Sequence, residues 1–335
     1  MKQKGTNFKR GVKLGVRGKY IEAIAELSQA VEQDPNFVAG HVSLGVVFHR
    51  LENDDDALAS YDRALGVDSK HAEAHYFRAN IFYPKKNIPQ GIAGYTVAIG
   101  LQPALIEAHR KPLPQDRLTD YNKNPAEMYW ILKPAYRILK CNDSLRANTR
   151  QADLYEERGS AYFELWNYEQ AITDYSSVLE LQPNNARIFQ YRGLSHERLG
   201  QFDHALEDYE QAITIDPKFS VAHINRGVTY GKMGKLRESV TSLSEGIRLD
   251  SNNPDGYFNR GTALFQLKDY EKAISDFSKV IQIAPNDEGA YYWRGASNEK
   301  AGHKRKAVTD YRQFLQLSRN SSARDEVEQK LRQLL

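Results

Sequence analysis

The chain of 335 residues carries 46 basic and 43 acidic side chains, for a formal net charge of +3, and 41% of its residues are hydrophobic. Such balanced charge gives no basic surface typical of nucleic-acid binding, and no apolar run is long enough to cross a bilayer, so we predict no nucleic-acid partner, no membrane insertion and a cytoplasmic location. The single cysteine, Cys141, excludes an intrachain disulfide and a zinc site built from cysteines.

A small residue recurs every 34 positions in two blocks of the sequence. It is Gly11, Gly45, Ala79, Gly159, Gly193, Gly227, Gly261 and Gly295. Twelve positions later a second small residue follows, and four positions beyond that a Leu, Tyr or Phe. Steps of four place the last two on one helical face, and a small residue facing a small residue lets two helices approach closely. We therefore predict a unit of two antiparallel helices.

The second helix of most units is followed by a residue that ends helices. Prolines stand there in five units, as Pro35, Pro103, Pro183, Pro217 and Pro285. Proline lacks an amide hydrogen and restricts the residue before it, so it stops the helix. Ser69 and Ser251 replace it in two units, where we expect more fraying.

The pattern of small, aromatic, alanine, bulky and proline positions resembles the tetratricopeptide repeat. The resemblance covers eight units, residues 4–37, 38–71, 72–105, 152–185, 186–219, 220–253, 254–287 and 288–321. One unit cannot bury its apolar face alone, so neighbours must stack. We predict an all-α, right-handed α-solenoid, with three units in residues 4–105 and five in residues 152–321.

An arginine precedes the recurrent small residue in most units. These arginines are Arg10, Arg78, Arg158, Arg192, Arg226, Arg260 and Arg294. Sixteen residues later five units carry an acid, Glu26, Asp174, Asp208, Asp276 or Asp310. We predict ion pairs within a unit or between neighbouring units, since a guanidinium fits a carboxylate. Near a surface each would contribute about 0 to 1 kcal/mol.

Ser242 breaks this pattern in the sixth unit. Because the unit then lacks the acid, we expect Arg226 or Arg260 to be freer to meet a partner.

Residues 106–151 fit no unit and form an insert. We expect one helix near residues 125–140, with Asn124 as N-cap, an apolar stripe that includes Met128, Ile131, Leu132, Ala135, Tyr136 and Leu139, and a kink at Pro134. The favoured interpretation is that this helix packs on the array between the third and fourth units. The alternative is that it docks on a partner, together with the basic loop around Arg110, Lys111 and Arg117.

If the resemblance holds, the first helices line a concave side that binds extended peptides or helices of partner proteins. Positions 2, 5, 6, 9, 12 and 13 of each unit then face the groove. The candidate partner-binding residues are Arg187, Gln190, Tyr191, Arg198, Asn225, Lys232, Phe258, Asn259, Phe265, Tyr292 and Trp293. Asn225 and Asn259 hold the same position in adjacent units and can each bind a backbone amide, whereas aromatics such as Phe163 and Phe265 can instead complete contacts between first helices.

The residues of the family's clamp for acidic chaperone tails are absent here, apart from Asn225 and Asn259. Two asparagines cannot neutralise a terminal carboxylate, so we predict no binding of such a tail.

Residues 322–335 are predicted to form a capping helix that starts at Ser322 and buries Val327, Leu331 and Leu334. At the other end no comparable cap precedes the first unit. We expect that unit to be frayed, covered by a partner or cut from a longer chain.

The sequence offers no arrangement that predicts catalysis. His71 and His75 flank Glu73, but no third ligand lies near, and phosphate-loop and nucleophile-elbow motifs are missing. We therefore predict a non-enzymatic adaptor without cofactor or metal, whose partner is a protein or peptide. The alternative is a structural subunit of a larger complex or a self-associating array that uses its outer faces and insert.

Overall fold

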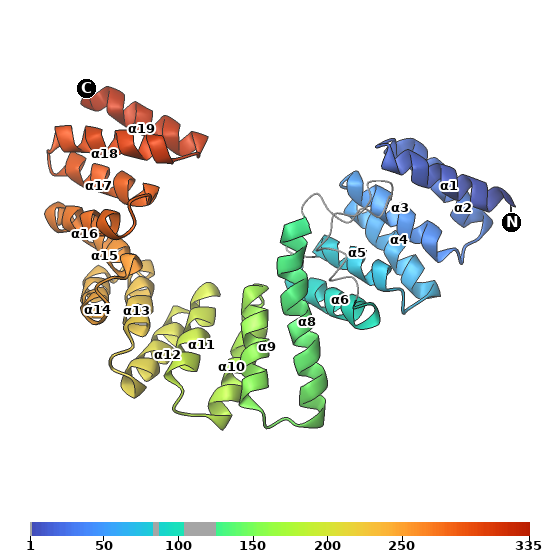
Figure 1. Cartoon of the computed structure of the whole chain (residues 1–335), viewed down its shortest axis with the longest axis horizontal. Helices are drawn as coiled ribbons and strands as arrows, with labels where there is room; N and C mark the ends of the chain where they lie inside the picture. Colours follow the sequence, from blue (N-terminus) through green and yellow to red (C-terminus); the bar gives the residue numbers. More distant parts are fainter. Residues whose placement is uncertain (1, 83–86, 104–124) are drawn as a thin grey trace. The chain divides into compact units, whose positions relative to one another are not determined.

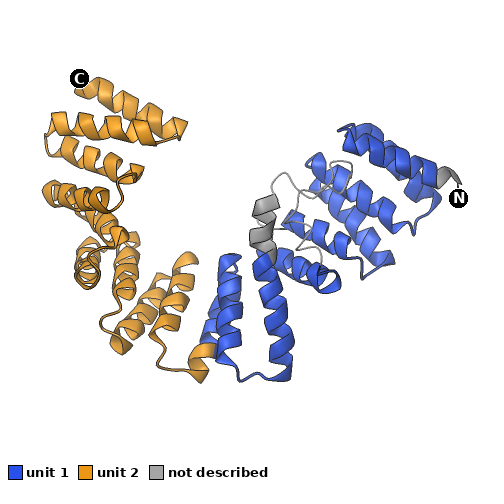
Figure 2. Ribbon diagram, viewed as in Figure 1, with its two compact units in different colours: residues 1–177 blue, residues 178–335 orange. Residues whose placement is uncertain are grey.

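The computed structural model describes residues 2–82, 87–103 and 125–335, and all the regular secondary structure in these ranges is α-helical (Figure 1). The helices are α1 (Lys2–Val16), α2 (Tyr20–Gln33), α3 (Val38–Arg50), α4 (Asp54–Val67), α5 (Ala72–Phe82), α6 (Ile88–Leu101), α8 (Pro125–Ala147), α9 (Ala152–Glu164), α10 (Tyr168–Leu181), α11 (Ala186–Arg198), α12 (Phe202–Ile215), α13 (Ser220–Lys232), α14 (Leu236–Leu249), α15 (Pro254–Gln266), α16 (Tyr270–Ile283), α17 (Glu288–Lys300), α18 (Lys304–Leu317) and α19 (Ser321–Leu334). They belong to two compact units, residues 1–177 and 178–335, which are described separately (Figure 2).

Local sequence explains where many helices begin. The side chain of Asn53 accepts a hydrogen bond from the Asp56 amide at the start of α4, and three aspartates in the first turn complement the helix dipole. Asn253 caps α15 in the same way, with Pro254 in its first turn. These short helices therefore start at fixed points and keep the repeat length constant.

The recurrent glycine lies where the two helices of a pair meet. A Cβ built on Gly261 would lie 2.9 Å from Cζ of Phe277, and one on Gly295 2.9 Å from Cδ1 of Tyr311. The contact partner is thus the bulky residue sixteen positions later, not the second small residue as the sequence suggested. The small side chain makes room for a ring, and the fully buried Phe277 and Tyr311 fill that room.

In residues 1–177, the pairs α1–α2, α3–α4 and α5–α6 share one buried apolar cluster that continues into α8 and α9. The insert helix α8 contacts both α6 and α9, which is the packing that the sequence favoured. It runs through Pro134 to Ala147, beyond the expected end near residue 140, because Cys141 and Leu145 extend its buried side.

Several residues of the insert prediction cannot be compared with the structure. Asn124 and the basic loop around Arg110, Lys111 and Arg117 lie outside the described residues, as do the side chains of Met128, Ile131 and Leu132.

In residues 178–335, the first helices α11, α13, α15 and α17 contact one another in order, and each packs against its own second helix. The helix α19 follows on α18 and buries Val327 and Leu331. Its N-cap is Asn320, whose side chain accepts from the Ala323 amide at 3.2 Å. The predicted cap, Ser322, was wrong because it already lies inside the first turn.

Candidate functional site

The predicted partner residues all belong to α11, α13, α15 and α17. We call the surface of these four helices the first-helix face. Arg187, Arg198 and Lys232 are exposed there, whereas Asn225 and Asn259 are partly buried. Partial burial holds a carboxamide in place while leaving some of it accessible, which suits recognition of a peptide backbone.

Gln190 does not lie on the accessible part of this face. Only 6% of its surface is exposed. A partner could reach Gln190 only after the packing around it had opened, so Gln190 is not part of the accessible first-helix face.

The aromatic residues near the end of the array contact one another. The rings of Phe265 and Trp293 meet edge to face at 5.3 Å, and Trp293 stacks on Phe277 at 6.4 Å. Phe258 also packs on Phe277, at 5.7 Å. These side chains join α15, α16 and α17, so the alternative interpretation, that Phe265 completes contacts between first helices, describes a contact that the structure contains.

Tyr292 is bound to the capping helix. Its hydroxyl donates to Oε1 of Glu326 in α19 at 2.8 Å. Burial, together with this hydrogen bond, raises the pKa of Tyr292 to about 12. Its contact with α19 makes Tyr292 part of the cap rather than an open anchor.

A buried carboxylate that the sequence analysis missed links two first helices. Glu197 of α11 is buried; one of its oxygens accepts from the Thr229 hydroxyl, and the other lies 2.8 Å from Nζ of Lys232. The signal was present, since Glu197 stands at the twelfth position of its unit, one of those expected to face the groove. The pairing orients Lys232 and partly satisfies its charge.

A cavity of about 260 Å³ opens between α13, α14 and α15, beside Asn259. Its lining is Val228, Gly231, Lys232, Leu236, Ser239, Asn259, Thr262, Ala263 and Gln266. Asn259 Nδ2 donates to the backbone oxygen of Asp255 at 2.8 Å, which leaves its carbonyl oxygen as an acceptor. Two of the predicted residues, Lys232 and Asn259, therefore meet at one concave site.

The predicted arginine pairs form within the units. Arg158 lies 2.6 Å from Asp174, Arg192 2.7 Å from Asp208, Arg260 2.7 Å from Asp276 and Arg294 2.6 Å from Asp310. The aspartate side chains of these four pairs are only 3–6% exposed, so they do not lie near the surface as expected, whereas the fifth predicted pair, Arg10 with Glu26, does, with Arg10 69% exposed. Desolvation by burial raises the pKa of Asp174, although Arg158 acts in the opposite direction.

The same arginines also reach back to the preceding second helix. Arg260 Nη1 donates to the Ser244 hydroxyl at 3.0 Å, and Arg294 Nη1 donates to the Ser278 hydroxyl at 3.2 Å. Both predicted geometries, within a unit and between units, therefore occur together. Each arginine connects three helices.

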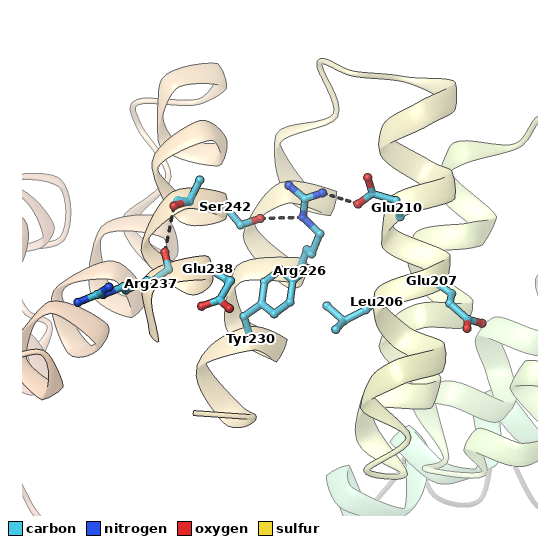
Figure 3. A pocket seen from close by; sticks show the side chains of 9 residues that line it. Leu206, Glu207, Glu210, Arg226, Tyr230, Arg237, Glu238 and Ser242 are labelled. Carbon is cyan, nitrogen blue, oxygen red and sulfur yellow. Dashed lines mark hydrogen bonds and ion pairs between the residues drawn. The ribbon is translucent and has the colours of Figure 1, made fainter. Parts of the chain in front are cut away.

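Where a unit lacks its own acid, the preceding unit supplies one. Arg226 donates to the Ser242 hydroxyl at 3.0 Å and pairs with Glu210, which stands where four other units carry serine (Figure 3). Arg78 likewise lies 2.7 Å from Asp62 in a unit that has Gly94 at the acid position. Neither Arg226 nor Arg260 is free, so that expectation was wrong.

A second cavity, of about 650 Å³, lies beside Arg226, between α12, α13 and α14 (Figure 3). Arg226 and Arg237 line it together with Glu207, Glu210 and Glu238, and Leu206 and Tyr230 supply apolar surface. The charges are mixed, and Arg226 is already paired, so the lining favours neither an anion nor a cation.

The described residues contain no group of three His, Cys, Asp or Glu side chains that could hold a metal ion. His71 Nδ1 accepts from the Ala74 amide, and His75 Nε2 contacts the Ser69 carbonyl at 2.9 Å. In the same part of the chain no helix is long and apolar enough to span a membrane.

Helix pairs joined through a glycine seam, repeated at 34 residues, define a helical-repeat scaffold. Tetratricopeptide-repeat families match residues 17–52, 55–105, 159–200, 186–219, 232–268, 254–287 and 289–321, which together are more than half of the sequence. The chain belongs to the tetratricopeptide-repeat family, a class of protein-interaction scaffolds that are generally not enzymes.

Solved structures of similar proteins include three repeat proteins. YrrB, described as a TPR protein with an unusual peptide-binding site, has 17% identity and a TM-score of 0.48 over 56% of this chain and 97% of its own. MamA from Desulfovibrio magneticus has 16% identity and a TM-score of 0.48 over 51% and 96%. The C-terminal part of a TPR repeat-containing protein from Cytophaga hutchinsonii has 22% identity and a TM-score of 0.49 over 57% of this chain and 77% of its own. No curated protein matches the chain significantly.

Proposed function

We propose that the first-helix face of residues 178–335 binds an extended segment of a partner protein, so that the chain works as a non-enzymatic adaptor in the cytoplasm. One observation carries the proposal. Asn225 and Asn259 occupy the same position on contacting helices, both partly exposed, with the cavity between α13, α14 and α15 beside Asn259. Carboxamides repeated at the spacing of the units can each donate to and accept from a peptide group.

The charges around these asparagines favour an internal segment of the partner over its C-terminal end. Lys232 is paired with Glu197, so it offers no unpaired charge to a chain terminus. We therefore keep the prediction that an acidic C-terminal peptide of the chaperone type does not bind. A low-micromolar affinity for such a peptide in calorimetry would contradict it.

Affinity capture from a lysate, followed by mass spectrometry, identifies the partner. Asn225→Ala combined with Asn259→Ala should then abolish its capture, because both backbone contacts are lost. Asn184→Ala combined with Asn252→Ala is the matched control, since these asparagines are exposed between helices of the same region. Unchanged capture by the first pair, at an unchanged melting temperature, would count against the face.

The alternative function, a structural subunit that assembles through its insert, makes a different prediction. Deleting residues 104–123 removes the part of the insert that precedes α8. Complex formation should survive this deletion if the first-helix face binds the partner, and it should fail if the insert does. The contacts of α8 with α6 and α9 favour the first outcome, since they already use this helix within the chain.

A further inference from the structure

Gly231 stands where most other units carry large side chains. It is the twelfth residue of its unit, and the equivalent positions in the other units of residues 152–321 hold Phe163, Glu197, Phe265 and Glu299, while the first unit has Gly15. Glycine is among the least favourable residues in a helix, and Gly231 lies within α13 rather than at a turn with positive φ. Local structure therefore gives no reason for a glycine here.

Packing gives no reason either. A Cβ on Gly231 would have one neighbour within 4 Å, the Ser239 hydroxyl at 3.3 Å. A Cβ on the seam residue Gly227 would lie 2.6 Å from Cγ of Leu243. Gly227 is required by the contact between helices, whereas at Gly231 only the Ser239 hydroxyl stands close to where a Cβ would lie.

Gly231 lines the cavity between α13, α14 and α15, which we call the Gly231 cavity. Val228, Leu236 and Ala263 give it apolar walls. Ser239, only 1% exposed, places a hydroxyl against it at a position where the other units have alanine or glycine. Two departures from the repeat pattern, Gly231 and Ser239, thus coincide at one site.

We propose that the Gly231 cavity holds one side chain of the bound segment, a tyrosine. The inference rests on the proposed function. A cavity of about 150 Å³ accommodates benzene, so about 260 Å³ is ample for a phenol ring. Its hydroxyl can bond with that of Ser239.

The charges at the cavity select a neutral side chain. Lys232 is paired with Glu197 at 2.8 Å, which makes it a poor counter-ion for an acidic side chain. No carboxylate lines the cavity among the described residues. An apolar body with an uncharged polar tip is therefore the best chemical match.

The test uses p-cresol, the side-chain analogue of tyrosine, with the full chain. In NMR spectra of the backbone amides, p-cresol should shift the signals of Gly231, Ser239 and Thr262 in the wild type. Gly231→Phe should abolish these shifts, since the new ring fills the cavity, and the fold should tolerate a residue that two other units carry at this position. No shift at these residues, or the same shifts in Gly231→Phe, would overturn the proposal.

A second variant tests the polar tip. Ser239→Ala restores the residue of most other units and should weaken p-cresol binding about fivefold, the loss of one hydrogen bond, while toluene binding stays the same. An unchanged affinity for p-cresol would rule out the tyrosine assignment.

The two experiments distinguish a failure of the cavity assignment from a failure of the proposed function. The p-cresol measurement needs no partner, so a negative result removes the Gly231 cavity alone. In the capture experiment, loss on Asn225→Ala with Asn259→Ala but not on Gly231→Phe would keep the first-helix face and reject the cavity as its anchor. Loss on Gly231→Phe as well supports both.

Discussion

The N-terminal pairs α1–α6 and the C-terminal pairs α11–α18 form the same helical hairpin, but different side chains lie between the two helices. In α3 the eight residues from Gly40 to Val47 are all buried, and Leu44 stands where other units have arginine. In α11, α15 and α17 the arginine remains and meets a buried aspartate. The glycine seam is common to both regions, so the group that crosses from the first helix to the second can be either apolar or ionic.

The accessible side of the first helices differs as well. Ser43 and Val46 of α3 are buried, whereas Asn225 and Val228, at the same positions of α13, are only partly buried. The helix α3 uses these positions for packing, whereas α13 leaves them in reach of a ligand. This difference is why we place partner binding on residues 178–335.

The sharpest test of the ionic region is Asp276→Ala, compared with Glu26→Ala. Asp276→Ala leaves Arg260, 22% exposed, without its carboxylate and should cost roughly 3 to 5 kcal/mol. Glu26→Ala should cost about 0 to 1 kcal/mol, because Arg10 is 69% exposed and stays hydrated. Urea unfolding measures both, and equal losses would erase the contrast between the regions.

Cys141, in α8, reports on residues 1–177 alone. Burial raises the pKa of Cys141 to about 11, so the group stays a neutral thiol at pH 8. Its reaction with a thiol reagent should be about 100-fold or more slower in the folded than in the unfolded chain, and should speed up as the pH approaches 11.

An exposed reference is Ser321→Cys in a Cys141→Ser background, which should react at the rate of a free thiol. Following Cys141 in rising urea then shows when residues 1–177 open. Rapid labelling of the folded wild type would show that this core is not closed.

The seam should behave alike in both regions. Gly261→Leu and Gly45→Leu each force a side chain against a buried ring, that of Phe277 or Tyr61, and should each cost about 1 to 3 kcal/mol. Gly231→Ala is the control, because that glycine is not in the seam and its Cβ would meet only the Ser239 hydroxyl; it should change the stability by no more than about 1 kcal/mol. An unchanged melting temperature for Gly261→Leu would contradict the assigned seam.

The smallest effect concerns the acid supplied by a neighbouring unit. Glu210 is 59% exposed, so Glu210→Ala should cost only about 1 kcal/mol. In a Ser242→Asp background the same change should cost almost nothing, because Arg226 then has a carboxylate in its own unit. A thermal-unfolding cycle measures the coupling, and additive losses would show that the two positions do not share Arg226.

Much of the fold follows from the sequence, because the unit is a local pattern. The all-helical repeat fold and the tetratricopeptide family are confirmed. The start of α19 was misplaced by two positions, since Ser322 and Asn320 are both good caps and only packing on α18 chooses between them. The candidate partner residues stay a prediction, and Gln190 shows the limit of that prediction, since it holds a position expected to face the groove and yet is buried.

The sequence by itself determined the hairpin and its repetition, because glycine, ring and proline act within 34 residues of one another. Only the tertiary structure decided which acids Arg78 and Arg226 meet, which first helices stay accessible and where a glycine borders a cavity. Those outcomes depend on side chains from the next unit. In a stack of similar hairpins, the side chains of the adjacent hairpin decide which positions are buried and which stay accessible.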